Sequence, residues 1–278
     1  MAEPGHVRGM PAPLRMMSPA LAIVSITGAA LFLWPFTGLP LPADTAALAL
    51  TVAGIMALAL VGIGTHQLDN RRLALLAVIA ALDSALRLAV VTGIAGFSPV
   101  FFLILCSGFV YGPSFGFLAG ALTLLTSALV TGGVGPWLPY EVFAAGWVGA
   151  AAGLVGGSRR QMPGRTAIIT LATAGFLLGY LYGAATDVYD WSVFYRGVPG
   201  LGWSPGMGPT QALTHFVRFY AATSLAWDTF RAVGNALMVL LLGPPVVAAM
   251  ARFRARFSLV VEPTVVTVSS QPPVATRV

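Results

Sequence analysis

Hydrophobic residues occur in long uninterrupted runs along most of the chain, from Met17 to Met250. The runs are about 20 residues long, which is the length that an α-helix needs to cross a hydrocarbon core of roughly 30 Å. Inside a bilayer every backbone polar group must be paired within the protein, so such runs form helices or a closed barrel. Apolar and polar residues do not alternate within them, which excludes a barrel. The pattern therefore predicts an all-α polytopic membrane protein.

The hydrophobic runs divide into eight predicted spans, separated mostly by glycine and proline. The first span is interpreted as retained, because the apolar core of a cleaved secretory signal is usually only about 7 to 15 residues long. A cleaved signal remains the alternative for that segment. The predicted spans are Met17–Gly38, Asp44–Gly64, Leu73–Ile94, Val100–Tyr111, Ser114–Thr131, Tyr140–Leu154, Ala167–Thr186 and Ala226–Met250.

Arginine residues near the span ends predict the orientation, because cytoplasmic loops are enriched in basic residues. With eight spans, ten arginines fall on the side of both termini, and only Arg196 and Arg218 fall opposite. This arrangement requires a helix break at Gly112-Pro113. We therefore expect a multi-pass protein of the cell membrane with both termini in the cytoplasm. The ten residues are Arg8, Arg15, Arg71, Arg72, Arg159, Arg160, Arg165, Arg252, Arg254 and Arg256.

Composition narrows the chemistry that the chain can perform. Charged residues make up 9% of the chain, and every basic residue is arginine. Without lysine there is no phosphate-binding P-loop and no lysine Schiff base. The single Cys106 excludes disulfides and cysteine-pair metal sites, and the histidines, His6, His66 and His215, lack metal-ligand spacing. We expect no enzyme activity, no cofactor, no metal and no nucleic-acid partner. A membrane enzyme or an assembly factor without cargo remains an alternative.

Charged residues within the predicted spans are candidates for ligand binding, because isolated charges in a membrane are costly and usually pair or line a cavity. Asp83 and Arg87 are four residues apart and are predicted to lie on one helix face. They form either a structural pair or a ligand site. The last span carries Trp227, followed by Asp228, Arg231 and Asn235 on one face, which lines either the bundle interior or a pocket.

Two predicted outer loops add further candidates. The segment from Asp187 to Leu225 is the one long loop, rich in aromatic residues that include Trp191, and residues 211–222 can form an amphipathic helix. The loop is either an aromatic belt at headgroup level or a lid over a bulky ligand. A shorter loop contributes Trp137 and Glu141.

Small residues recur every four positions in the third span, at Ala77, Ala81, Ala85 and Ala89. Such a stripe lets a second helix approach closely, which is how helices associate in lipid. The stripe predicts either packing within the chain or a docking face for a partner subunit.

Taken together, residues from about Arg71 to Phe257 resemble the substrate-specific (S) component of energy-coupling factor (ECF) vitamin transporters. The resemblance rests on six spans with both ends inside, the alanine ladder and the terminal helix from Asp228 to Asn235. It also rests on three glycine-rich stretches, which are residues 108–120, 132–137 and 146–153.

The resemblance implies a six-helix, ECF S-component-like bundle at residues 65–256. It is preceded by a tail at 1–16 and two additional helices at 17–64, and is followed by a tail at 257–278 that we expect to be disordered. It implies capture of a vitamin from outside, with cobalamin favoured and thiamin, riboflavin, folate or a precursor as alternatives. It also implies docking on a transmembrane coupling subunit that two cytoplasmic ATPase subunits drive.

In that family, small residues of the first helix pack on the coupling subunit, which points to Ala77 and Ala81. The competing interpretation is an ion-coupled secondary transporter that acts alone through its membrane charges.

Overall fold

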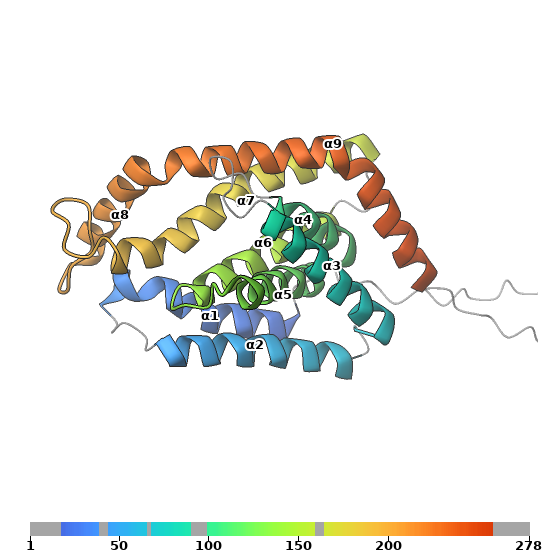
Figure 1. The fold of residues 1–278 in the computed structure, drawn as a ribbon, viewed down its shortest axis with the longest axis horizontal. Helices are drawn as coiled ribbons and strands as arrows, with labels where there is room; N and C mark the ends of the chain where they lie inside the picture. Colours follow the sequence, from blue (N-terminus) through green and yellow to red (C-terminus); the bar gives the residue numbers. More distant parts are fainter. Residues whose placement is uncertain (1–17, 39–43, 66–67, 90–98, 159–163, 258–278) are drawn as a thin grey trace, which may run out of the picture.

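The structure, a computed structural model, describes residues 18–38, 44–65, 68–89, 99–158 and 164–257. The predicted tail at 1–16 lies outside these ranges, as does the predicted tail at 257–278 apart from Phe257, which ends α9. Every regular element in the described part is an α-helix (Figure 1). The helices are α1 (Pro19–Thr37), α2 (Asp44–Gly64), α3 (Asn70–Ala89), α4 (Val100–Tyr111), α5 (Pro113–Thr131), α6 (Leu138–Ser158), α7 (Gly164–Val193), α8 (Pro209–Thr223) and α9 (Leu225–Phe257).

Each predicted span overlaps a helix of the structure, which confirms an all-helical fold. Met17 and residues 90–94 of the predicted spans lie outside the described residues. Six helices, α1, α2, α5, α6, α7 and α9, are long and apolar enough to cross a membrane. Helix α4 has only 12 residues, about 18 Å at 1.5 Å per residue, and so is too short to cross alone. The described chain is thus consistent with a polytopic membrane protein, with six rather than eight helices that meet the length and polarity expected of a span.

The predicted break between the fourth and fifth spans is present at Gly112. Its φ of 104° lies in a region that favours glycine, and Pro113 follows at the first position of α5, where the missing N–H costs nothing. The break turns the chain back on itself, so that α4 and α5 both pack against α6.

Helices α4, α5 and α6 meet through glycine. Gly108 and Gly116 face the carbonyl of Gly149 on α6, and Gly120 faces the carbonyl of Ala145. A Cβ atom at any of these glycines would overlap the neighbouring backbone. Small residues allow this approach where lipid provides no hydrophobic driving force between helices. The three helices form the densest part of the fold.

One end of the bundle gathers the arginine-bearing helix ends. Arg254 of α9 donates to the carbonyl of Val110 at 2.6 Å, and Tyr111 donates to the carbonyl of Met250 at 2.9 Å. The charge of Arg72, at the start of α3, also acts on Tyr111. Arg72 and Arg254, two of the arginines that were predicted to share one side of the membrane, therefore both lie near Tyr111.

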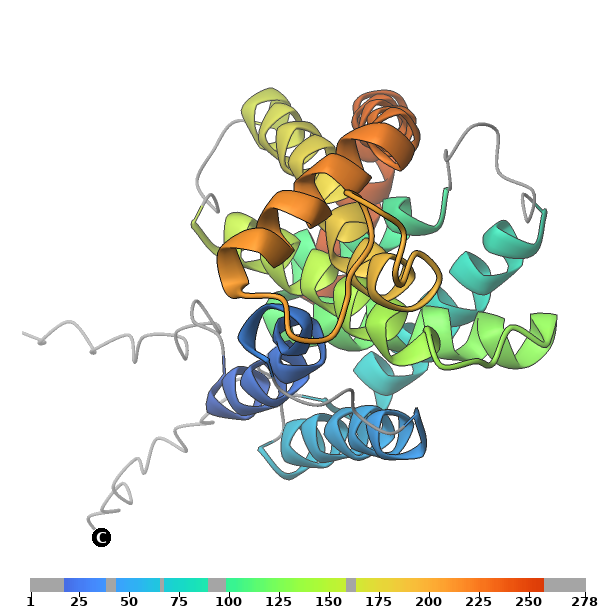
Figure 2. The ribbon, with the colours of Figure 1, turned by 90° about the vertical axis from the view of Figure 1, so that its left-hand side faces the viewer.

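The opposite end carries α8 and the loop at 194–208, and we call it the α8 end (Figure 2). Part of the sequence prediction is wrong here, because residues 187–193 were assigned to a loop but continue α7. Asp187 and Trp191 lie on the buried face of α7, so packing extends the helix beyond its purely apolar part. The amphipathic segment predicted at residues 211–222 is confirmed as a helix, α8.

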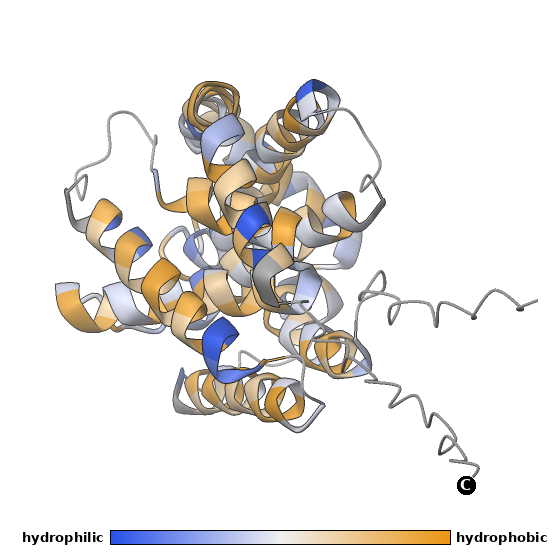
Figure 3. Ribbon diagram, turned by 90° about the vertical axis from the view of Figure 1, so that its right-hand side faces the viewer, coloured by the Kyte–Doolittle hydropathy of each residue, from blue (hydrophilic) through white to orange (hydrophobic). Residues whose placement is uncertain are grey.

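The two additional helices differ in how they join the bundle. Helix α1 buries Trp34, whose indole N–H donates to the hydroxyl of Tyr140 on α6 at 3.1 Å. Helix α2 keeps many apolar side chains outward, such as Met56 and Leu60. Figure 3 shows apolar residues along most of the helices, with hydrophilic residues at a few positions.

Candidate functional site

Five of the predicted ligand-binding residues gather near the α8 end, on α3, α6, α7 and α9. They form two ion pairs and one unpaired carboxylate around Tyr182, which is itself buried. We call this set the polar cluster; its members are Arg87, Glu141, Tyr182, Asp187, Asp190, Tyr220, Ser224, Asp228 and Arg231.

The first ion pair joins α3 to α6. Arg87 lies 3.5 Å from Glu141 and donates to the hydroxyl of Ser127 at 2.8 Å. Of the two alternatives for Arg87 and Asp83, the structural pair is not formed, because Arg87 turns toward α5 and α6. Neither carboxylate oxygen of Asp83 has a hydrogen-bond partner among the described residues, and the backbone of Ile104 is a close neighbour.

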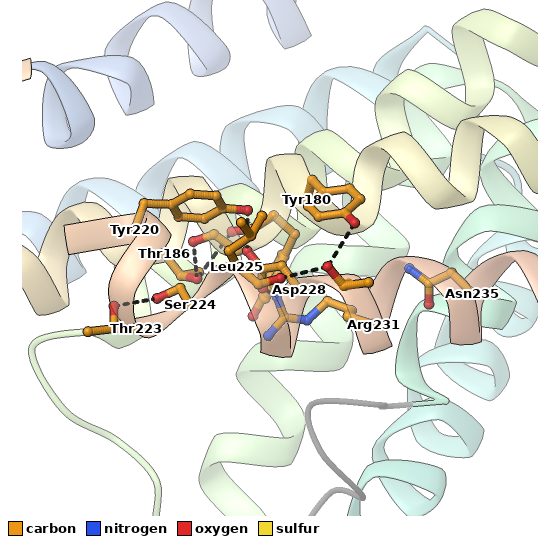
Figure 4. A network of polar contacts seen from close by, with 12 residues as sticks. Tyr180, Thr186, Tyr220, Thr223, Ser224, Leu225, Asp228, Arg231 and Asn235 are labelled. Atoms are coloured by element: carbon orange, nitrogen blue, oxygen red, sulfur yellow. Dashed lines mark hydrogen bonds and ion pairs between the residues drawn. The ribbon is translucent and has the colours of Figure 1, made fainter. Parts of the chain in front are cut away.

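The second ion pair lies within α9 and is held by two other helices (Figure 4). Asp228 pairs with Arg231, one turn along the helix, and accepts a hydrogen bond of 2.8 Å from Tyr220 on α8. Its carboxylate rests against Gly183 of α7, where a Cβ atom would overlap it. Asp228 is only 2% exposed, so these contacts replace the water that a carboxylate otherwise needs.

The glycines of α7 set the register of the α7–α9 contact. Gly175 faces Asn235, Gly179 faces Ala232, and Gly183 faces Asp228. The same register, extended by one turn of α7, brings Asp187 to Ser224, which hydrogen-bonds to its carboxylate. Gly175, Gly179 and Gly183 thus occupy every fourth position of α7, and the next such position, Asp187, places a carboxylate at the α8 end.

Tyr182 brings the two ion pairs into one site. The guanidinium of Arg231 lies over its ring, 5.3 Å from the centroid, and its hydroxyl interacts with the charges of Glu141, Arg87, Arg231 and Asp228. Glu141 in turn interacts with Arg231 as well as with Arg87. The arrangement presents both signs of charge inside an apolar bundle, and can hold a ligand that carries polar or charged groups.

Four further residues predicted to bind ligand lie apart from the cluster. Asn235 bonds to the carbonyl of Gly175 at 3.3 Å and serves helix packing. Trp227 points outward and is 52% exposed. Trp137 lies in the turn before α6, against Gly135. Trp191 is fully buried and donates to the carbonyl of Leu201 at 2.7 Å.

The predicted docking residues lie on the outward face of α3. Ala77 and Ala81 are both exposed, and the same face carries exposed Val78 and Leu82. Ala77, Ala81 and Ala85 are therefore not buried against another described helix of this chain. This face is available to a second protein or to lipid.

Sequence reasoning did not assign Tyr182, Asp190, Tyr220 and Ser224 to the site. Asp190 lies three residues after Asp187, so helical spacing from Asp187 would have found it, whereas Tyr182 lies five residues before Asp187 and is not on the same face by that rule. No local pattern links Tyr220 to Asp228, since that contact depends on the turn between α8 and α9. Among the described residues, no group of three or more His, Cys, Asp or Glu side chains could hold a metal ion.

Comparison of the chain with protein-family models, with curated proteins and with solved structures finds no match. Any functional conclusion therefore depends on the sequence and on the geometry of the polar cluster.

Proposed function

We propose that this chain is the substrate-binding membrane subunit of an ATP-driven, ECF-type micronutrient importer. The observation that carries the proposal is the polar cluster, in which α3, α6, α7 and α9 supply charges to one region of an apolar bundle. Charges at such depth usually mark a substrate pathway or a ligand site. In this proposal the cargo binds at the α8 end, and a partner supplies the energy.

The outward face of α3 supports a partner-dependent mechanism. Ala77 and Ala81 are small apolar residues exposed on α3. In the family that the sequence resembles, such residues pack against the coupling subunit. The chain also has no lysine for a P-loop, so ATP hydrolysis would come from separate subunits.

The aromatic residues near the α8 end, which had suggested a lid over a bulky ligand, do not identify the vitamin. Trp191 stacks on Phe36 of α1 with 5.4 Å between ring centroids, and Phe219 packs against Tyr195 at 4.7 Å. These rings pack against one another, so they do not line an open surface. The proposal is therefore a vitamin or related micronutrient, with cobalamin as one candidate.

A thermal-shift screen of the purified chain against cobalamin, thiamin, riboflavin, folate and biotin tests the proposal. A ligand that binds only the folded state adds about 2.7 kcal/mol at 100 times its dissociation constant. We expect one vitamin to raise the melting temperature and Arg231→Ala to abolish the rise. Arg218→Ala removes an exposed arginine of α8 and should leave it unchanged. No rise with any vitamin would refute the proposal.

The docking step needs its own test in cells. Ala77→Trp and Ala81→Trp should stop uptake of the vitamin found in the screen while leaving its binding intact. Ala46→Trp, on the exposed surface of α2, is the matched control. Normal uptake by both α3 variants would remove the docking assignment.

One observation favours an ion-coupled secondary transporter instead. Asp83 is fully buried, and its carboxylate has no hydrogen-bond partner among the described residues, as in sites that exchange protons or cations. This alternative predicts uptake by the chain alone, abolished by an ionophore and by Asp83→Asn. Uptake that requires ATP and survives Asp83→Asn would exclude it.

A further inference from the structure

Asp187 is the one member of the polar cluster with an unsatisfied charged atom. Its Oδ2 is buried and has no hydrogen-bond partner among the described residues, although the side chain receives a hydrogen bond from Ser224. The residue is 9% exposed. A carboxylate oxygen removed from water without a partner is costly, so its presence beside other charges indicates a missing partner.

The balance of charge around Asp187 defines that partner. The polar cluster contains four carboxylates, Asp187, Asp190, Asp228 and Glu141, and two guanidinium groups, Arg87 and Arg231. Each arginine is already committed to another carboxylate, Arg87 to Glu141 and Arg231 to Asp228. Asp187 also interacts with Asp228 and Asp190, both of its own sign. The site is therefore short of positive charge.

Two tyrosines belong to the polar cluster, and one of them, Tyr220, lies near Asp187. Tyr220 interacts with the charges of both Asp228 and Asp187, and Tyr182 already holds the guanidinium of Arg231 over its ring. Cations bind favourably to aromatic faces, most strongly where water is excluded. Because the described residues offer no metal-ligating group of three, an organic cation suits the site better than a metal ion.

We propose that Asp187, supported by Asp190 and the ring of Tyr220, binds a positively charged organic group of the cargo, such as an ammonium or a quaternised ring nitrogen. The inference rests on the proposed function, whose cargo site it narrows to cationic ligands. It places thiamin, which carries a fixed positive charge, ahead of neutral riboflavin and anionic biotin.

The test uses two probes on the purified chain, thiamin and benzyltrimethylammonium, with binding measured by calorimetry. The second probe is a fixed cation on an aromatic ring and is not a vitamin, so it reports on the cation site alone. We expect both to bind, and Asp187→Asn to weaken both by about tenfold or more, as for loss of one partner of a buried charge pair. Asp190 is half-buried, and Asp190→Asn should weaken the binding of both probes less.

Asp44→Asn is the matched control, because Asp44 is an exposed carboxylate whose charge reaches Tyr140 and Tyr189 at the same end of the bundle. It removes equal charge from outside the cluster and should leave affinity unchanged. The melting temperature of unliganded Asp187→Asn should stay equal or rise, because an unpaired buried carboxylate is lost. Failure of that variant to fold would overturn the inference by giving Asp187 a structural role.

The outcomes separate the inference from the proposed function. Binding of a neutral or anionic vitamin without binding of either cation overturns the inference and leaves the importer proposal standing. Binding of benzyltrimethylammonium that depends on Asp187, with no vitamin bound, supports the inference and refutes the vitamin proposal. Equal affinity of both cations for the wild type and for Asp187→Asn also overturns the inference.

Discussion

Helices α4, α5 and α6 meet backbone to backbone, whereas the α8 end is held together by side chains. In the first region, Gly116 and Gly149 bring two helices so close that no Cβ atom fits between them. In the second, Trp203 donates to the carbonyl of Pro35 at 3.0 Å, and Phe36 packs edge-on against Phe216. Contacts between backbones allow few alternative arrangements, while contacts between side chains can open locally. The difference implies that α4, α5 and α6, which we call the glycine-packed floor, are rigid, whereas the α8 end can rearrange.

The α8 end also explains why α1 belongs to the bundle. Trp34 and Trp203 meet edge to face at 5.0 Å, and Pro35 is in the last turn of α1, where helix carbonyls lack internal partners. The loop therefore uses a free carbonyl of α1 as its anchor. An additional helix without an obvious role in the sequence thus supports the end that carries the polar cluster.

The largest expected effect comes from the glycine-packed floor. Gly149→Leu places a branched side chain where a single Cβ atom already overlaps the carbonyl of Gly116, so we expect no folded protein by size-exclusion chromatography. Gly64→Leu is the control, because open space surrounds Gly64. Normal folding of Gly149→Leu would show that α5 and α6 can separate, and would end the contrast between the two regions.

A local opening is expected from Phe36→Ala. The variant removes the ring that contacts Trp191 and Phe216, and aromatic pairs contribute about 0.5–1.5 kcal/mol each beyond their burial. Because the chain has no lysine, trypsin can cut the loop at 194–208 only after Arg196. Cleavage there should accelerate by roughly tenfold, since proteolysis follows the population of the open form.

The loop assay has two controls. Leu33→Ala alters an exposed residue of the same helix and should leave the rate of cleavage after Arg196 unchanged. The melting temperature of Phe36→Ala should fall only slightly although the cleavage rate rises, because α4, α5 and α6 stay packed. Equal cleavage of the wild type and of Phe36→Ala would show that α1 does not hold the loop.

A smaller and pH-dependent effect is expected at Tyr220. Burial, followed by its hydrogen bond to Asp228 and nearby negative charge, raises the pKa of Tyr220 above its usual range. The folded state then keeps the phenol proton at pH values where the unfolded chain, with a pKa of about 10, loses it. The stability from this group is complete below about pH 10 and is lost as the pH rises further.

Tyr220→Phe removes that alkaline dependence. We expect the variant to lose about 1 kcal/mol of stability at pH 7, the typical contribution of one hydrogen bond, and to approach the wild type above pH 10. Melting curves from pH 7 to 11 measure both. A difference in stability between the wild type and Tyr220→Phe that stays constant from pH 7 to 11 would contradict the titration of Tyr220 as the cause.

The smallest effect is expected on the lipid-facing surface. Leu241 of α9 is 74% exposed, and substitutions away from packed sites usually change stability by less than about 0.5 kcal/mol. Leu241→Ala should therefore leave the melting temperature within about 2 °C of the wild type. A large loss would mean that another protein or part of the chain covers this face.

The helices could be predicted from the sequence, because the signals for them are local. Apolar runs of sufficient length, glycine and proline at their ends, and an amphipathic segment at residues 211–222 all correspond to helices of the structure. The end of α7 was misjudged, since Asp187 and Trp191 interrupt the apolar run that defines the span. Their burial depends on neighbours from other helices.

The sequence by itself determined an all-helical chain with several membrane-length helices, and it singled out the residue types that carry charge within them. Only the tertiary structure decided which charges meet. Arg87 pairs with Glu141, 54 positions away, rather than with Asp83 on its own helix. The physical reason is that packing between helices, through glycine where α4, α5 and α6 meet and where α7 meets α9, sets the rotation of a helix about its axis. That rotation decides whether a side chain faces a partner, the core or lipid.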